Sequence, residues 1–139
     1  MKKVFSYIGL AILMVLMTSV LTAAASTPDV KFKLVQGLPE TMELGDTATV
    51  VVEVTSKTPF LYAQALPTAF FPGRGVVAAK GDHVGAGQKA QLEVTFTAKD
   101  STDDFAQAPG YAPVSVVVGV RFAGGYVISE RYDFTVVVP

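Results

Sequence analysis

Apolar and polar side chains alternate with a period of two over most of the chain after residue 29. In the first such run, two lysines separate Val30, Phe32 and Leu34. This alternation is typical of a half-buried β-strand, because successive side chains of a strand point to opposite faces. The pattern recurs with apolar positions in residues 48–54, 92–98, 114–122 and 126–138. No helix-length stretch after residue 25 carries an apolar stripe of period 3.6, so we expect an all-β fold.

Turn-forming residues separate the alternating runs. Gly45–Asp46 precedes the second run, and Gly124–Gly125 indicates a tight hairpin between the last two. Residues 56–87 are less regular, and there we expect one strand near residues 61–65 and another near residues 75–79. About seven short antiparallel strands separated by turns predict a sandwich of two packed sheets.

Residues 1–25 have the pattern of an export signal. Lys2 and Lys3 supply a positive start, a mainly apolar run follows, and three small residues end at Ala25. Cleavage there leaves residues 26–139 as one domain, which we expect to be secreted, periplasmic or at the cell surface. The alternative is an uncleaved membrane anchor, because the apolar run reaches the length of about 20 residues that crosses a bilayer. In that case the N-terminal segment is the only contact with the membrane.

Charge and cysteine content narrow the functional classes. Removal of residues 1–25 takes away Lys2 and Lys3, so the formal net charge moves from −1 to −3. The remaining basic residues do not cluster, and we expect no nucleic-acid partner. The chain has no cysteine, which excludes disulfides, thiolate metal sites and cysteine nucleophiles. Packing alone must therefore stabilise the domain.

Three segments carry a resemblance to a known family. They are "ELGDTATVVVEVTS", "VGAGQKAQLEVTFTAKD" and "APGYAPVSVVVGVRF". Together they resemble the immunoglobulin-like adhesion and cell-surface modules of bacteria and archaea called CARDB. The resemblance implies an immunoglobulin-like β-sandwich over nearly all of residues 26–139. It implies interaction rather than catalysis, although these motifs mostly encode the geometry of the sandwich.

The residues that catalysis requires are scarce. His83 is the only histidine, and it stands in the segment "KGDHVGAG". We interpret it as a solvated loop histidine, because the preceding Asp82 is a neighbour in sequence and does not make a catalytic triad. A copper-binding sandwich needs two histidines and a cysteine, which this chain does not have. We therefore expect neither enzymatic activity nor a cofactor.

A cluster of carboxylates follows the fifth expected strand. Asp100, Asp103 and Asp104 lie in the segment "KDSTDDF". Three carboxylates within five residues can begin a calcium site, since calcium takes several converging oxygen ligands. The spacing does not match an EF-hand loop, so we favour a solvated turn over a metal site.

Aromatic residues gather in or near the expected connections, where polar residues are usual. They are Phe60, Tyr62, Phe70, Phe71, Phe105 and Tyr111. In a sandwich of this strand order, the connections after strands one, three and five share one end. A cluster there closes the core, with Arg74 facing the aspartates, or it forms a binding surface. The candidate binding residues are Phe70, Phe71, Arg74, Phe105 and Tyr111.

These features lead to three functional hypotheses. The first is an exported, non-catalytic immunoglobulin-like module that contacts a protein or a component of the cell envelope. The second is a secreted protease inhibitor of the chagasin kind, because the ending "SERYDFTVVV" of this chain resembles the ending of those inhibitors. However, "SKTPFLY" lacks the inhibitors' first binding loop. The third is a structural subunit that pairs sheet edges into a surface filament or layer.

We expect the export signal to be removed between Ala25 and Ser26. The three small residues before this bond fit the peptidase, and the first strand begins only at Val30, which leaves an accessible linker. N-terminal sequencing of the exported protein tests this. A membrane-bound product that retains Met1 would show that the segment is an anchor instead.

Overall fold

The computed structural model describes residues 28–69, 75–78, 80–99 and 110–139, so the expected signal peptide lies outside the described residues. Within these ranges the regular secondary structure is entirely strand. No helix long and apolar enough to cross a membrane occurs in them. The strands are β1 (Val30–Gln36), β2 (Thr47–Phe60), β3 (Tyr62–Ala69), β4 (Gly75–Ala78), β5 (Asp82–Val84), β6 (Gly87–Lys99), β7 (Gly110–Arg121) and β8 (Val127–Val138).

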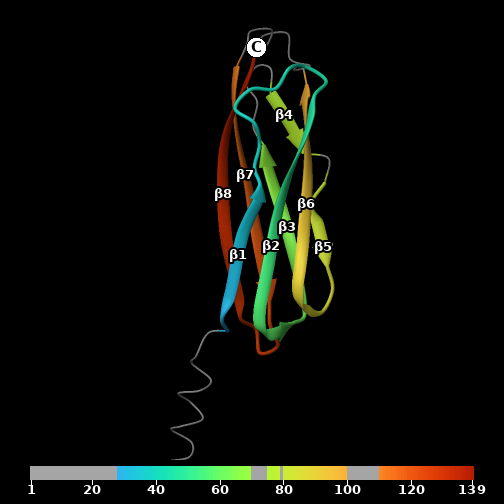
Figure 1. Ribbon diagram of the computed structural model, residues 1–139, viewed down its shortest axis with the longest axis vertical. Coiled ribbons are helices and arrows are strands. Elements are labelled where there is room, and N and C mark those ends of the chain that lie inside the picture. Colours follow the sequence, from blue (N-terminus) through green and yellow to red (C-terminus); the bar gives the residue numbers. More distant parts are fainter. Residues whose placement is uncertain (1–27, 70–74, 79, 100–109) are drawn as a thin grey trace, which may run out of the picture.

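These eight strands form two antiparallel sheets of four strands each (Figure 1). The first sheet has the order β1-β2-β6-β4, and the second has the order β5-β3-β7-β8. The ladders β2–β6 and β7–β8 are the longest of the two sheets and carry most of the pairing. The all-β sandwich predicted from the alternation is confirmed, with one more strand than the seven expected.

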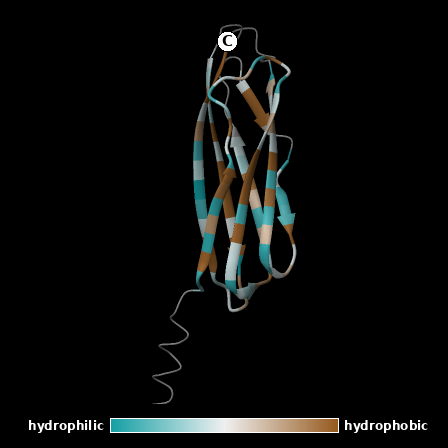
Figure 2. Cartoon of the chain, in the orientation of Figure 1, coloured by the Kyte–Doolittle hydropathy of each residue, from teal (hydrophilic) through white to brown (hydrophobic). Residues whose placement is uncertain are grey.

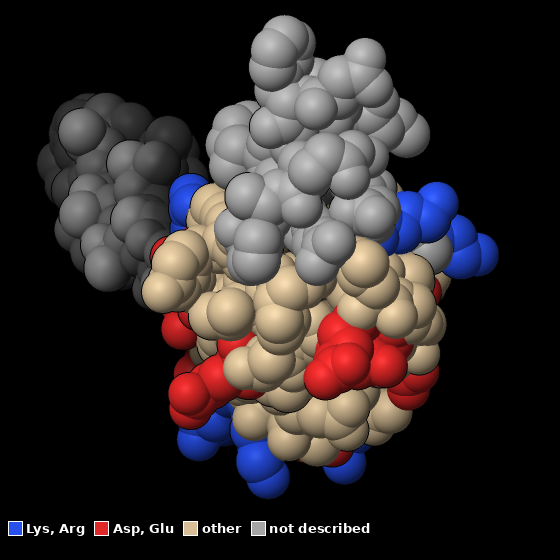
Figure 3. Space-filling model, turned by 90° about the horizontal axis from the view of Figure 1, so that it is seen from above, with Lys and Arg blue, Asp and Glu red and all other residues tan. Residues whose placement is uncertain are grey.

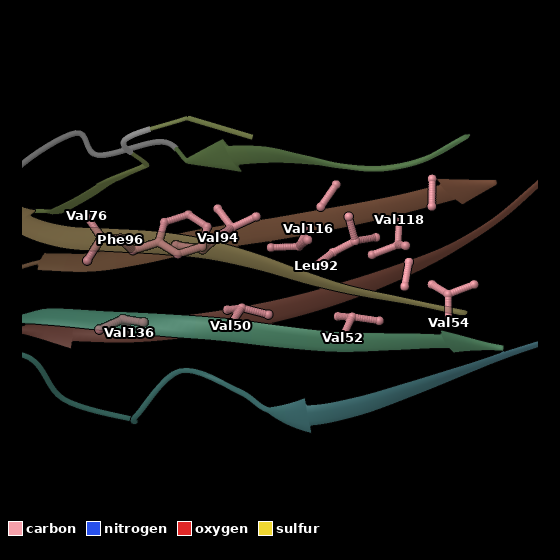
Figure 4. Packing of buried hydrophobic residues seen from close by; sticks show 14 of the residues in the cluster. Val50, Val52, Val54, Val76, Leu92, Val94, Phe96, Val116, Val118 and Val136 are labelled. Atoms are coloured by element: carbon pink, nitrogen blue, oxygen red, sulfur yellow. The ribbon is translucent and has the colours of Figure 1, made fainter. Parts of the chain in front are cut away.

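The core consists of the inward rows of both sheets (Figure 4). Every second residue is buried over residues 50–56 of β2, 90–98 of β6 and 112–120 of β7, and the intervening residues face outward. Burying a Val, Leu or Phe side chain contributes roughly 1.5–3 kcal/mol, so these rows supply the main stabilising free energy. Colouring by hydropathy shows the same alternation along the strands (Figure 2). The buried positions predicted for these strands include Val50, Val52, Val54, Leu92, Val94, Phe96, Val114, Val116, Val118 and Val120.

Strand β1 departs from the predicted pattern near its end. Val30 and Phe32 pack against the core as expected, but Leu34 is 36% exposed. Leu34 pairs with Val52, whereas Gln36 pairs with Val51, so the register shifts between them. Leu34 therefore lies at the rim of the sandwich, because a bulged edge strand has no further strand beside it to cover its side chains.

The predicted turns take backbone conformations that suit glycine. Gly45 has φ of 94°, and Gly124 and Gly125 have φ of 90° and 96°. Residues with a Cβ rarely adopt this left-handed region. In the second turn, the Phe122 N–H donates to the Tyr126 carbonyl at 2.9 Å, which closes the hairpin between β7 and β8.

The chain passes from the first sheet to the second between strands β4 and β5. β4 pairs with the end of β6 in the first sheet, and β5 then pairs with β3 in the second. Where β6 loses β4 as a neighbour, the Asp82 carboxylate accepts a hydrogen bond from the Glu93 N–H at 2.7 Å. A side chain thereby satisfies a strand donor that would otherwise lack a protein partner.

The crossing point requires glycine. A Cβ built on Gly81 would lie 2.4 Å from the carbonyl oxygen of Ala65, a backbone atom that cannot move without disturbing the β3–β5 ladder. We expect Gly81→Ala to destabilise the fold by about 1–3 kcal/mol, the usual cost of overpacking. Chemical denaturation measures this. Gly85→Ala is the matched control, since a Cβ there meets nothing within 4 Å; equal effects at both positions would contradict the crossing as described.

Candidate functional site

Most of the predicted site residues lie outside the described residues. This applies to the predicted interface residues Phe70, Phe71, Arg74 and Phe105 and to the calcium candidates Asp100, Asp103 and Asp104. Tyr111 is described: it lies on β7 and is 69% exposed, so it faces solvent rather than the core. The interface and calcium hypotheses for the loop end therefore stay predictions.

The connection between β1 and β2 closes one end of the core. Met42 is fully buried, and its N–H donates to the Val137 carbonyl at 3.0 Å. Glu40, Glu43 and Asp46 in the same connection are exposed. Figure 3 looks onto this end and shows acidic side chains on its described part. The end is thus closed by an aliphatic side chain and lined by carboxylates.

The strand ends that flank residues 70–74 and 100–109 lie at this same end. Gly75 pairs with Lys99, and Gly110 pairs with the last residue of β8. The backbone N–H of Gly45 also donates to the carbonyl of the residue before Lys99, at 2.9 Å. The flanks of the three connections are therefore neighbours, as the predicted strand order required.

The outward face of the first sheet is mainly polar, although Val35 on its edge strand β1 is 50% exposed. Thr49 and Thr95 lie opposite each other, with their hydroxyl oxygens 3.0 Å apart. A shallow hollow between β2 and β6 is lined chiefly by Glu53, Thr55, Lys89 and Gln91. This face has the composition of an ordinary solvated surface. Its other outward side chains include Lys31, Lys33, Thr47, Glu93, Thr97 and Lys99.

The outward face of the second sheet is richer in apolar and aromatic side chains. Leu66 is 52% exposed and Val127 is 58% exposed. Leu66 lies opposite Val117, and Val117 lies opposite Arg131. These three residues form a row across strands β3, β7 and β8. We call this surface the apolar face. Its outward side chains are Tyr62, Gln64, Leu66, His83, Tyr111, Val117, Arg121, Val127, Arg131 and Asp133, with the small polar residues Thr68, Ser115, Ser129 and Thr135 in the same outward rows.

An aromatic pair lies at one margin of the apolar face. The rings of Tyr62 and His83 are stacked, with centroids 5.1 Å apart and an interplanar angle of 25°. His83 belongs to strand β5, so its assignment to a loop was wrong, although it is exposed as expected. The short β5 escaped prediction because its three residues carry no periodic signal of their own. Both oxygens of Asp82 accept backbone N–H groups, one from His83 at 2.9 Å and one from Glu93 at 2.7 Å.

A polar cluster lies on the opposite margin of the face. The Ser115 hydroxyl donates to the Asp133 carboxylate at 2.6 Å, and the Arg131 guanidinium donates to the same oxygen at 2.8 Å. The serine hydrogen bond, followed by the hydrogen bond from Arg131, lowers the pKa of Asp133 below its ordinary value. The carboxylate therefore keeps its negative charge over the whole physiological pH range.

Among the described residues, no group of three or more His, Asp and Glu side chains could hold a metal ion. The structure instead brings together a surface that was not predicted from the sequence, with Leu66 and Val117 in one row and Val127 at the start of the edge strand β8. The sequence does show that apolar residues stand at outward positions of these alternating strands. It does not show that these residues are neighbours, because that depends on the order of the strands in the sheet.

Comparison with known proteins supports the fold. No family model matches the sequence, and no curated protein matches it. The structure is similar to the solved part of native alpha-2-macroglobulin from Escherichia coli that spans domain MG7 to the C-terminus. The identity is 14% over 83% of this chain and 17% of that chain, with a TM-score of 0.50. The sporulation control protein Spo0M from Bacillus subtilis aligns at 16% identity over 81% of this chain and 49% of that one, with a TM-score of 0.38.

The chain thus spans less than a fifth of the macroglobulin structure and about half of Spo0M. The two four-stranded antiparallel sheets and the macroglobulin likeness define an immunoglobulin-like β-sandwich, which confirms the predicted fold class. Membership of the CARDB family stays a prediction.

Proposed function

We propose that this protein is an exported, non-catalytic immunoglobulin-like module that binds a protein or a component of the cell envelope through its apolar face. The observation that carries the proposal is the contrast between the two outward faces. One is covered mainly by threonine, lysine and glutamate and exposes Val35 on its edge strand, whereas the other exposes Leu66 and Val127 and carries the Tyr62–His83 stack.

The composition of the apolar face suits recognition. The centres of protein interfaces are enriched in aromatic residues and arginine and depleted in lysine and glutamate. On this face Tyr62 lies opposite Arg121, and Arg121 lies opposite Val127. Gly119 lies one row further along and leaves open space above the sheet, since a Cβ there meets nothing within 4 Å. The partner can therefore approach the backbone closely at the centre of the face.

The surroundings of His83 support a non-catalytic role. A histidine acting as general base needs a nucleophile within hydrogen-bond reach and a second group that orients its ring. The only aromatic contact of His83 in the described part of the chain is the stacked ring of Tyr62. The neighbouring Asp82 carboxylate is engaged by two backbone N–H groups, so it is not directed at the imidazole.

The fold gives less support to the protease-inhibitor alternative. The segment "SKTPFLY" runs from the end of β2 into β3. Within it Ser56 and Phe60 are buried, and the Leu61 N–H donates to the Arg121 carbonyl at 2.8 Å. These contacts hold the segment to the core and to the second sheet, while Lys57, Thr58, Pro59 and Leu61 between and beside them are exposed.

Site-specific photocrosslinking in the producing cell tests the proposal. A photoreactive residue at Leu66 or Val127 should give covalent adducts with an envelope component, because the partner covers these positions. The same residue at Gln91, exposed on the first sheet, is the matched control. Leu66→Asp should abolish the adducts formed from Val127 while the melting temperature stays within a few degrees. Adducts that form equally from both faces would contradict the proposal.

A further inference from the structure

Strand β8 is an edge strand, and it is long. Its twelve residues pair with β7 from Val127 to Val138 without any shift of register. On its other side, the described chain contributes only one bridge, from Thr41 to Val137. There the Val137 N–H donates to the Glu40 carbonyl at 2.8 Å.

That bridge determines which backbone groups of β8 face outward. The peptide groups of an antiparallel strand point alternately to its two sides. The N–H and C=O of Val137 both point away from β7, since they bond to Glu40 and Met42. Because the register is unbroken, every second residue before Val137 points the same way. The residues concerned are Ser129, Arg131, Asp133 and Thr135. In the described part of the chain, their outward N–H and C=O groups have no backbone hydrogen-bond partner.

We propose that β8 pairs antiparallel with β8 of a second copy of this chain, about a twofold axis at Tyr132. In this register Arg131 lies opposite Asp133 of the second copy, and Asp133 lies opposite its Arg131. Ser129 lies opposite Thr135 in the same way. The residues that face each other are those whose N–H and C=O groups are free, so each such pair exchanges two backbone hydrogen bonds.

Charge selects this register. Moving the strands by one residue pair in either direction sets Arg131 against Arg131, or Asp133 against Asp133. Like charges directly opposite one another destabilise a ladder, whereas opposite charges stabilise it. In the proposed register the two arginines and two aspartates alternate in sign around a square, because Arg131 and Asp133 are already 2.8 Å apart within each strand. Charged residues usually keep sheet edges apart, but an alternating pair makes the edge selective for its own complement.

The β1 edge of the first sheet lacks this complementarity. Its strand β1 has seven residues and a register shift after Leu34. The charged side chains on it are Lys31 and Lys33, so antiparallel self-pairing sets positive charges against one another. The edge chemistry therefore favours β8 over β1 as the site of self-association.

Pairing also covers apolar surface at the rim of the sandwich. Ile128, Tyr132 and Phe134 form the inward row of β8, and they are only partly buried. Burial in this row raises the pKa of Tyr132 above its ordinary value, with the nearby Glu130 charge adding to the shift. A second strand beside β8 would cover the open side of the row. The result is a continuous antiparallel sheet of eight strands, in which the apolar faces of the two copies lie side by side.

The charges provide a swap experiment. The full chain is expressed, and its exported form is studied by native mass spectrometry and by sedimentation over a range of concentrations. We expect a dimer for the parent protein. Arg131→Asp and Asp133→Arg should each reduce dimer formation at least tenfold, because each places like charges in opposition. An equimolar mixture of these two variants should form a heterodimer, since every pair across the axis is then opposite in sign.

Cysteine substitution tests the register independently of charge. The chain has no cysteine, so a single introduced thiol reports without background. Tyr132→Cys should form a disulfide between two copies, because this residue lies opposite itself in a non-hydrogen-bonded pair with a short Cα–Cα separation. Ile128→Cys is the matched control, as it lies opposite Val136 of the second copy and should not crosslink.

Three results would overturn the inference. They are a parent protein that stays monomeric at all concentrations, charge variants that dimerise as well as the parent, or disulfides that form equally from both cysteine positions. Thermal unfolding of each variant identifies any that fail to fold, and the cysteine pair then decides. This inference and the proposed function fail separately, since Leu66→Asp should leave the dimer intact: Leu66 lies on β3, which is separated from the β8 edge by β7.

Discussion

The interior shared by the two sheets is the constraint on which the rest of the structure depends. Each long strand places alternate residues there, and the central parts of β2, β6 and β7 bury all of theirs. With no cysteine in the chain, this packing has to stabilise the domain without covalent links. If the pairing of a central strand shifted by one residue, its apolar side chains would face solvent instead of the core. The core therefore also fixes the register of every ladder. The outward rows are free to differ between the sheets, and they do.

The sequence predicts the long strands well because their alternation is local. The inward positions of residues 48–54 and 92–98 follow from periodicity alone. Leu34 is misplaced because a bulge at a sheet edge leaves no local trace. Strand β5 is missed for a related reason: its place depends on the pairing of Asp82 with Ala65 and on a hydrogen bond to Glu93, both distant in sequence.

The candidate site was less predictable than the fold. The predicted binding residues are aromatic residues in connections, together with Arg74, and of these the structure describes only Tyr111. The apolar face instead arises when Leu66 of β3 and Val117 of β7 are brought into one row. Each residue alone is an unremarkable outward side chain, because single exposed apolar residues are common on protein surfaces. Their association becomes visible only once the strand order is known.

The same alternation links the core to the free edge of β8. Residues whose side chains face the core direct their backbone groups toward β7, and the residues between them direct theirs to the open side. Two prolines fit this scheme. Pro67 on β3 lies beyond the last residue of β3 that pairs with β5. Pro113 on β7 lies beyond the last residue of β7 that pairs with β3. The missing N–H of each proline therefore leaves no gap in a described ladder. The edge of β8 is therefore a consequence of the core register and not a separate feature.

Residue-resolved amide hydrogen exchange along β8 tests this account most directly. At low protein concentration, we expect slow exchange at the amides bonded to β7, which are Ile128, Glu130, Tyr132 and Phe134. We expect fast exchange at the intervening amides, which are Ser129, Arg131, Asp133 and Thr135. Raising the concentration should slow the second set and leave the first unchanged. Equal protection of both sets at low concentration would contradict the account, because β8 would then have a partner on both sides within one chain.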